Sequence, residues 1–274
     1  PAGPVSGRIN VAVLRLPHIS NFTDFAPLAR ETCVNLHYLS RPRRLSGYEL
    51  VLLPGCKNVR SDLDWMRQTG WTARLAEYVR AGGQVGGVCG GYQMLGRAID
   101  DPHGLEGPPG RSEGLDLLPV ETTLQPEKVL TRTVGAWIDG GLTVDGYEIH
   151  TGLTRRVGPC EPVVRVASRN GRADDDRDGA RTGDGRVWGT YLHGLFDEVD
   201  FRREFLRRLC PALAEHVPAE TAESVAAFRQ RQYDLLAEHF RRHLDMDRLV
   251  AIVAEAEGGP IPALRAPASA SGQA

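Results

Sequence analysis

The sequence predicts an α/β fold, with a mainly parallel β-sheet flanked by helices and additional antiparallel strands. Three observations support this class. Short apolar runs alternate with helical segments between Arg8 and Val88, as in sheets whose crossovers are helices. Two of these runs end in glycine-containing turns, Pro54-Gly55 and Cys89-Gly90. Strand-like runs follow one another between residues 120 and 168.

The elements of the first half follow from their apolar patterns. A strand over Arg8–Leu16 ends at Pro17, and Ser20–Asp24 offers N-cap residues for a short helix. Val34–Leu39 is the second expected strand, and Glu49–Leu53 has the short apolar pattern of a central parallel strand.

The next elements lead to a cysteine. Leu63–Arg80 has helical spacing that is interrupted near Gly70, and Gly82-Gly83 ends it. Gln84–Val88 is the following strand, and it runs directly into Cys89. Because reactive groups in such sheets gather beyond the carboxyl ends of the strands, Gly55 and Cys89 are expected at the same edge.

The second half contains more strands. Asp100–Gly114 is rich in Gly and Pro and is expected to be a surface loop, and Asn170–Gly185 is expected to be a polar, mobile loop. A strand from Arg186 carries His193 at its end, and a helix follows to about Leu209. The expected antiparallel strands are Val120–Thr123, Lys128–Val134, Leu142–Ile149 and Val163–Ser168.

The ends of the chain differ in composition from its middle. Pro1-Ala2-Gly3-Pro4 lacks both an initiating Met and a signal-peptide pattern, so we interpret residues 1–7 as a linker. Residues 8–257 are expected to form one domain, with a charged helical segment over Thr221–Glu257. Residues 258–274 are expected to be a disordered tail.

Composition excludes several classes of protein. Lys+Arg 33 against Asp+Glu 35 gives a formal net charge of -2, which points to neither nucleic acid nor a membrane surface. No apolar run is long enough to span a bilayer. The five cysteines form no CxxC pair, and their odd number argues against a disulfide framework. We therefore expect no metal site and a reducing, cytoplasmic location.

Cys89 is the candidate nucleophile. A cysteine between a strand and a helix, followed by Gly90-Gly91, is typical of the tight turn that exposes a nucleophile above a sheet edge. A helix that begins at the cysteine favours its thiolate form. Taken alone, the pattern leaves a second interpretation open, a glycine-rich loop with a buried structural cysteine.

His193 is the candidate proton carrier. A cysteine hydrolase needs a histidine to take and return protons, and N–H donors for the oxyanion. Among the eight histidines, His193 alone closes a Val-Trp-Gly-Thr-Tyr-Leu strand and is followed by glycine. A histidine at a strand end is more often structural, and its pairing with Cys89 makes the catalytic interpretation the stronger one.

These motifs resemble the class I glutamine amidotransferases, which have a flavodoxin-like fold. Gly87–Gly96, with Cys89, and Gly189–Gly194, with His193, carry the resemblance to the superfamily. Other segments resemble its cobalamin branch, in particular the C-terminal glutaminase half of the cobyric acid synthase family. These segments are Ile9–Phe25, Leu53–Asn58, Asp62–Arg67 and Gly146–Gly152. The resemblance covers roughly residues 8 to 240.

The resemblance implies roles for individual residues. Cys89 would attack the side-chain amide of L-glutamine and release ammonia, and His193 would protonate the ammonia and then activate water. The backbone of Gly55, Cys56 and Gly90 would form the oxyanion hole. Gln93 would help to hold the glutamine, although a helix-surface amide is an equal alternative.

One position departs from the superfamily. Many members have Glu two residues after the histidine, and this chain has Leu195 there. We therefore expect a Cys–His pair without a carboxylate, as in the cobalamin branch. Glu148 and His150 are possible accessory residues, with a salt bridge or a partner contact as the alternative. Lys57 and Asn58 would face the glutamine or the partner domain, and the alternative is that they only form a turn.

The resemblance also implies a partner. The sequence contains no GxxxxGK[ST] phosphate loop, so this chain is expected to bind no nucleotide. ATP and Mg²⁺ would be bound by an N-terminal synthetase domain, which would amidate adenosylcobyrinic acid a,c-diamide with the ammonia. The alternatives are a glutaminase for cobyrinic acid or for a lipid-linked cell-wall precursor, a catalytically silent assembly domain, and a cysteine peptidase on the same fold.

Overall fold

The computed structural model of the protein describes residues 3–218 and 223–257. It divides into two compact units, Pro1–Ala222 and Glu223–Ala274. We expected one domain over residues 8–257, whereas the structure groups the C-terminal helices in a unit of their own. The expected tail, 258–274, lies outside the described residues. From residue 3 the expected linker lies against the first strand, where Asn10 Nδ2 donates a hydrogen bond to Val5 O (3.1 Å).

A mainly parallel sheet forms the centre of the first unit. Five neighbouring strands pair in parallel, and one short strand pairs antiparallel at the edge. The order is β14 (Ala180–Arg181), β15 (Val187–Thr190), β4 (Gln84–Val88), β3 (Leu50–Leu53), β1 (Ile9–Leu14) and β2 (Val34–Leu39). The strands β1 and β3 are buried along their whole length, as their continuous apolar runs predict.

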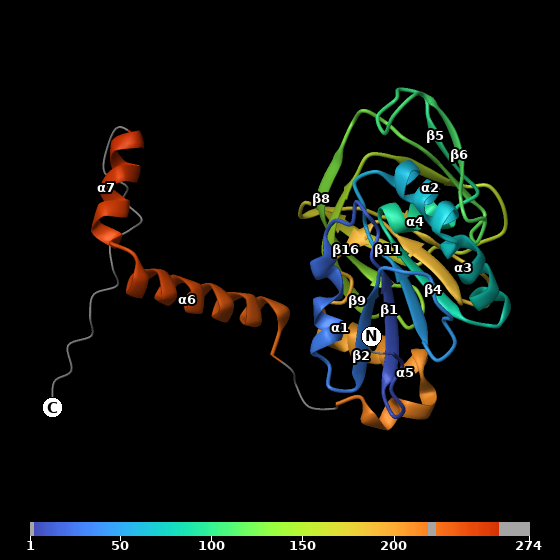
Figure 1. Cartoon of the computed structure of the whole chain (residues 1–274), viewed down its shortest axis with the longest axis horizontal. Coiled ribbons are helices and arrows are strands. Elements are labelled where there is room, and N and C mark those ends of the chain that lie inside the picture. The colour runs from blue at the N-terminus through green and yellow to red at the C-terminus, as the bar shows by residue number, and fades with distance from the viewer. Residues whose placement is uncertain (1–2, 219–222, 258–274) are drawn as a thin grey trace. The chain divides into compact units, whose positions relative to one another are not determined.

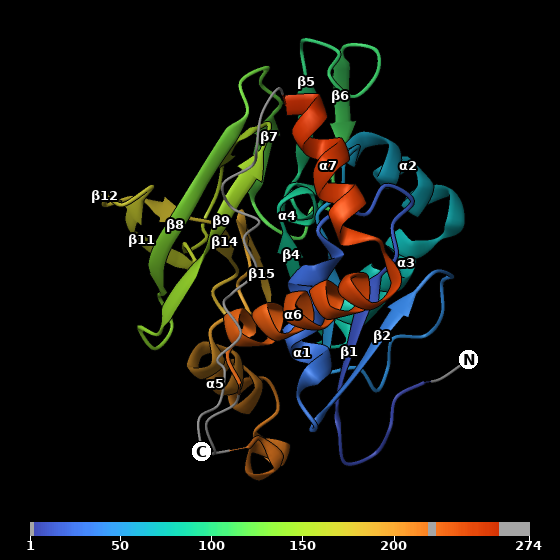
Figure 2. The same cartoon turned by 90° about the vertical axis from the view of Figure 1, so that its left-hand side faces the viewer.

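Helices flank this sheet in Figures 1 and 2. Gly70, with φ 87°, separates the two halves of the expected helix because only glycine adopts this conformation without strain. The helices of the first unit are η1 (Phe22–Phe25), α1 (Ala26–Arg30), α2 (Val59–Thr69), α3 (Trp71–Arg80), α4 (Gly90–Leu95), α5 (Val199–Leu209) and η2 (Pro211–His216). The expected α/β class, with helices flanking a parallel sheet, is confirmed.

The remaining strands form two smaller sheets. One has the order β10 (Leu153–Arg156), β7 (Val120–Thr123), β5 (Ala98–Asp101) and β6 (Gly110–Glu113). The other has the order β12 (Arg172–Ala173), β11 (Val164–Arg169), β8 (Val129–Trp137), β9 (Thr143–His150) and β16 (Leu192–His193), and β13 (Arg177–Asp178) also pairs with β11. All pairs in the second sheet are antiparallel, as the sequence predicts. Strand β7, which was also expected to be antiparallel, pairs antiparallel with β10 but parallel with β5.

Two expected loops contain strands. The segment 100–114 includes β6, and the segment 170–185 includes β12, β13 and the edge strand β14. The prediction that residues 170–185 are too polar to pack is wrong, because Ala180 and Asp178 are buried. Backbone pairing with β11 and β15 orders this segment, and hydrophobicity patterns do not report such pairing.

The second unit consists of helices α6 (Val225–His243) and α7 (Met246–Glu257). Ser224 caps α6, with its Oγ accepting a hydrogen bond from Ala227 N (3.1 Å), as is usual for a serine at this position. Within the residues that the structure describes, no helix is both long enough and apolar enough to cross a bilayer.

The carboxyl ends of the parallel strands bring distant segments together. Cys89 follows β4, the turn at Gly55 follows β3, and the loop with Asp24 follows β1. Strand β15 continues through Tyr191 into β16, which ends at His193. These residues therefore meet at one edge of the sheet, where open α/β folds bind their ligands.

Helix α4 lies unusually close to β3. A Cβ atom on Gly91 would lie 2.1 Å from Leu53 O, and backbone atoms at this distance cannot give way as a flexible side chain does. Glycine at this position lets α4 begin immediately after Cys89 without displacing β3.

Gly91→Ala is therefore predicted to destabilise the first unit. Although alanine favours helices by about 1 kcal/mol over glycine, forced repacking of a core costs about 1–3 kcal/mol, and the short contact here places the net change on the destabilising side. Denaturant unfolding measures this free energy. Gly183→Ala is the matched control, because a Cβ atom there meets nothing within 4 Å, and its effect should stay within about 0.5 kcal/mol. Equal stability of the two variants would contradict the assigned contact.

Candidate active site

Cys89 occupies a strained turn between β4 and α4. Its φ of 53° and ψ of −111° lie outside the common regions for a residue with a side chain. Its backbone N donates to Thr190 O (2.8 Å), which ties the turn to the strand that leads to His193. Strain of this kind costs of the order of 1–3 kcal/mol and is concentrated at functional sites. The conformation agrees with the nucleophile turn and disfavours the alternative of an ordinary buried cysteine.

The Cys89 thiol contacts two polar groups. Its Sγ donates to Ile149 O at 3.4 Å, and it lies close enough to the imidazole of His193 to raise the pKa of that ring. Helix α4 has only six residues, so its dipole at the sulfur is weaker than the sequence suggests. The imidazole is therefore the main cationic partner at the sulfur.

His193 is buried, and both of its ring nitrogens have polar neighbours. Its Nδ1 lies 2.7 Å from Asp24 Oδ2, and its Nε2 lies 3.3 Å from Asn21 Nδ2. The ring of Tyr147 stacks on the imidazole, with 5.1 Å between centroids. Burial lowers the pKa of His193, but the contacts with Asp24 and Cys89 outweigh it and raise this pKa to about 9.

Asp24 corrects the expectation of a Cys–His pair without a carboxylate. Leu195, at the position where the superfamily has Glu, is a buried apolar residue. The carboxylate instead comes from η1, 169 residues before His193, and its Oδ1 also accepts a hydrogen bond from Gly194 N (3.3 Å). In the sequence Asp24 is one of several N-cap candidates, and the helix it precedes has no side-chain cap.

The expected oxyanion residues lie beside Cys89. A Cβ atom on Gly55 would lie 3.1 Å from His193 Cε1, and one on Gly90 would lie 3.1 Å from Cys56 N. Burial raises the pKa of the Cys56 thiol well above its usual value, and the nearby Asp62 and Cys89 raise it further. Cys56 therefore stays protonated and is a poor candidate for the nucleophile.

A cavity of about 330 Å³ opens over these groups. It is lined by Cys89, Gly90, Cys56 and Gln93 and, at its sides, by charged residues. Gln93 is buried, which excludes the helix-surface alternative, and its Nε2 donates to Tyr191 Oη (3.0 Å). Its amide is thus fixed in orientation at the cavity wall.

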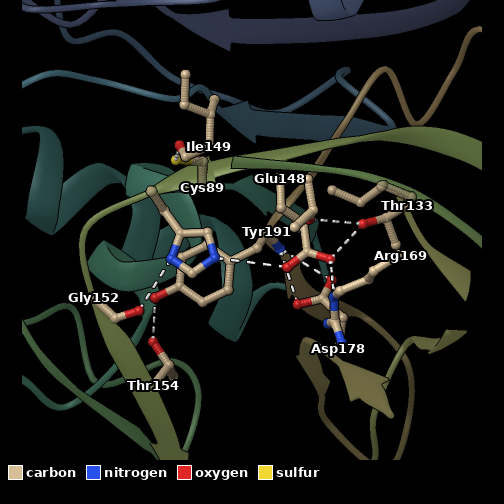
Figure 3. A network of polar contacts seen from close by, with 12 residues as sticks. Cys89, Thr133, Glu148, Ile149, Gly152, Thr154, Arg169, Asp178 and Tyr191 are labelled. Carbon is tan, nitrogen blue, oxygen red and sulfur yellow. Dashed lines mark hydrogen bonds and ion pairs between the residues drawn. The ribbon is translucent and has the colours of Figure 1, made fainter. Parts of the chain in front are cut away.

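Glu148 and His150 lie on β9, and only His150 lines this cavity. Figure 3 shows Glu148 directed toward Arg169 and Thr133, at 3.0 Å and 2.7 Å. Burial opposes ionisation of Glu148, but its hydrogen bonds with His150, Arg169 and Thr133 lower its pKa to about 2. Glu148 therefore forms a salt bridge, which is the alternative to an accessory role.

His150 is held from three sides. Its Nδ1 donates to Gly152 O (3.0 Å), its Nε2 lies 3.7 Å from Glu148 Oε2, and its ring stacks on Tyr191 with 3.7 Å between centroids. His150 also lines a second cavity of about 540 Å³, together with Tyr191 and Glu148. These three contacts fix the position of His150 in the cavity wall.

Asp178 is a further residue that the sequence analysis missed. Its carboxylate accepts hydrogen bonds from the Thr190 hydroxyl and from Tyr191 N (3.1 Å), which fixes the bend between β15 and His193. Burial raises its pKa to about 6. Among the described residues no group of three or more His, Cys, Asp or Glu side chains is arranged to hold a metal ion.

The chain is similar to known proteins over most of its length. The CobB/CobQ-like glutamine amidotransferase domain matches residues 10–201. A cobyric acid synthase of Chlorobium phaeobacteroides is 49% identical over 254 residues, which are 92% of this chain and 49% of that protein. A cobyric acid synthase of Rhodobacter capsulatus is 42% identical over 252 residues, 92% of this chain and 50% of that protein. The chain thus spans about half the length of these relatives.

Solved structures share the fold. A chain of PurLQS from Thermotoga maritima aligns with a TM-score of 0.53 and 15% identity, over 76% of this chain and 99% of that one. A glutamine amidotransferase aligns with a TM-score of 0.52 and 18% identity, over 73% and 98%. The region that matches the family contains Asp24, Cys89 and His193, and on this evidence the chain belongs to the CobB/CobQ-like glutamine amidotransferase domain family.

Proposed function

We propose that this chain is the glutaminase part of a cobyric acid synthase, in which it hydrolyses L-glutamine to glutamate and ammonia. The observation that carries the proposal is the strained Cys89 turn in contact with a buried histidine, whose far nitrogen lies 2.7 Å from the Asp24 carboxylate. This arrangement has the parts of a nucleophile, a proton carrier and a group that orients it. Membership of the glutamine amidotransferase family supplies the substrate.

The first half of the reaction forms a thioester. The Cys89 thiolate attacks the carboxamide carbon of glutamine, and the backbone N–H groups of Cys56 and Gly90 stabilise the oxyanion. The C–N bond then breaks as His193 donates its Nε2 proton to the leaving nitrogen, so ammonia departs and a glutamyl thioester remains on Cys89.

The second half releases glutamate. His193, now neutral, removes a proton from water, and the resulting hydroxide attacks the thioester carbon. The C–S bond breaks, the sulfur leaves as a thiolate, and the thiolate–imidazolium pair is restored. Asp24 accepts a hydrogen bond from Nδ1–H throughout, which keeps Nε2 directed at the reacting atoms.

The amidation itself belongs to a partner. The relatives that are cobyric acid synthases are about twice as long as this chain. We propose that an N-terminal synthetase domain binds ATP, Mg²⁺ and adenosylcobyrinic acid a,c-diamide, and uses the ammonia made at Cys89. All five cysteines are free, which agrees with the reducing cytoplasm that we propose as the location.

Cys89→Ala tests the nucleophile. The variant should release no ammonia above background from glutamine, because no other thiol in the cavity ionises readily. Cys210→Ala, which removes a thiol outside the cavity, should keep wild-type turnover. Covalent labelling by a diazoketone analogue of glutamine, read by mass spectrometry, should modify Cys89 alone. Full turnover by Cys89→Ala would refute the mechanism.

Asp24→Asn tests the carboxylate. Wild-type kcat/KM should fall on the alkaline side near pH 9, because the imidazolium of His193 is lost there. Without the Asp24 charge the pKa of His193 should move toward its ordinary value of about 6.5, so the alkaline limb should shift to lower pH. The loss of kcat should be of the order of 10²- to 10⁴-fold, as for other triads.

Asp24→Glu is the matched variant, and it should recover part of the activity and the position of the alkaline limb. The pair of His193 and Asp24 also makes the stability of the folded protein depend on pH. Because the pKa of His193 is raised on folding, its contribution is complete below about pH 6.5 and is lost as the pH rises through about 9. An Asp24→Asn variant with the wild-type pH profile would show that Asp24 has only a structural role.

A further inference from the structure

The two lysines of the chain share one location. The sequence has 33 Lys+Arg residues, and every one except Lys57 and Lys128 is arginine. Both lysines line the cavity that contains Cys89. They come from separate segments, since Lys57 follows the turn at Gly55 and Lys128 precedes β8. A chain that otherwise uses arginine for its positive charges therefore places lysine only at this cavity.

Lysine and arginine differ in ways that matter for a small cavity. The lysine ammonium is a compact point charge on a flexible stem, whereas the arginine head is a planar fork with five donors. The cavity of about 330 Å³ has to admit a substrate beside these side chains. Both lysines are exposed at its mouth, and neither ammonium group has a hydrogen-bond or ion-pair partner among the described residues. They are thus available to an anion that enters.

Glu106 gives the same cavity a fixed negative charge. It lines the cavity beside Cys56 and Val59, and its side chain is half-buried. Its Oε2 accepts a hydrogen bond from Arg60 N (2.9 Å) at the start of α2, and Val59 N also donates to the carboxylate. These bonds hold the carboxylate in place and leave acceptor positions free, because two oxygens accept about four hydrogen bonds.

The ammonium groups of the two lysines and the carboxylate of Glu106 match the two opposite charges of a free amino acid. Lys57 and Glu106 belong to the wall formed with Cys56 and Val59. Lys128 lies beside a different part of the lining, since its neighbour Val129 pairs with His150 of β9. Free glutamine carries a carboxylate and an ammonium group on one carbon, three bonds from the carboxamide carbon. With the carboxamide at Cys89, this charged end would lie among the other residues that line the cavity, which include Lys57, Lys128 and Glu106.

We propose that Lys57 and Lys128 bind the α-carboxylate of glutamine and that Glu106 binds its α-ammonium group. This assignment rests on the proposed glutaminase function and adds to it the residues that select a free amino acid. A glutamine within a peptide lacks both charges, so the same residues would exclude protein side chains from Cys89. The cavity then discriminates by charge at its mouth and reacts at its base.

The assignment predicts a change in substrate binding without a change in chemistry. The charged end of glutamine lies away from the reacting carbon, so these contacts are equally strong in the ground state and the transition state. Lys57→Met, Lys128→Met and Glu106→Gln should each raise KM for glutamine by about 10-fold or more and leave kcat within about 2-fold. Arg74→Met and Glu77→Gln, which change an exposed ion pair on α3, should change neither value.

Substrate analogues assign each charge to its receptor. Glutaramate lacks the α-amino group, and L-glutaminamide lacks the α-carboxylate charge. Wild type should prefer glutamine over both in kcat/KM by at least 10-fold. Glu106→Gln should lose the preference over glutaramate and keep that over L-glutaminamide. Each lysine variant should show the reverse.

The outcomes distinguish a wrong assignment of Lys57, Lys128 and Glu106 from a wrong glutaminase function. Wild-type turnover of glutamine, with all three variants retaining the wild-type KM and both preferences, would overturn the assignment and leave the glutaminase function in place. A uniform fall in kcat for all three substrates at constant KM would also overturn it, since the charges would then support structure or a partner domain. Absence of glutamine turnover by wild type, even after addition of a synthetase partner, would overturn the proposed function together with the assignment.

Discussion

The reactivity of Cys89 depends on the close approach of α4 to β3. Gly91 lets the helix backbone lie against Leu53 O, where any Cβ atom would collide with it. The helix can therefore begin one residue after Cys89, and the turn takes a strained conformation with positive φ that is typical of a nucleophile turn. A wider separation would relax the turn and take the thiol away from its histidine. The geometry of this site thus depends first on the packing of the backbone of α4 against β3.

The second dependence is electrostatic. A buried imidazolium is unfavourable unless a negative charge lies beside it, and Asp24 supplies that charge. Since its Oδ1 also accepts from Gly194 N, one carboxylate positions both the ring and the backbone of the histidine. The same edge of the sheet holds the charged mouth of the cavity, with Glu106 fixed at the start of α2. In the proposed mechanism, the groups that react and the groups that select the substrate are therefore held by different elements.

Much of the fold and part of the site could be predicted from local patterns. Continuous apolar runs identified β1 and β3, and the glycines after Cys89 identified the turn, because both features reflect constraints within a few residues. The polar segment with Asp178 was misjudged, since its order comes from pairing with β11 and β15. Hydrophobicity reports burial of side chains and does not report backbone pairing.

Asp24 shows where prediction from sequence ends for this protein. The sequence showed Asp24 as one of several N-cap candidates, but His193, to which it is bound, lies 169 positions away. The superfamily pattern instead pointed to the position of Leu195. The sequence alone was sufficient for the fold class and for the choice of Cys89 and His193 as candidates, because each carries a local signature. The third member of the site and the grouping of both lysines with Glu106 required the folded chain, because parallel strands bring remote loops to one edge only once the sheet has formed.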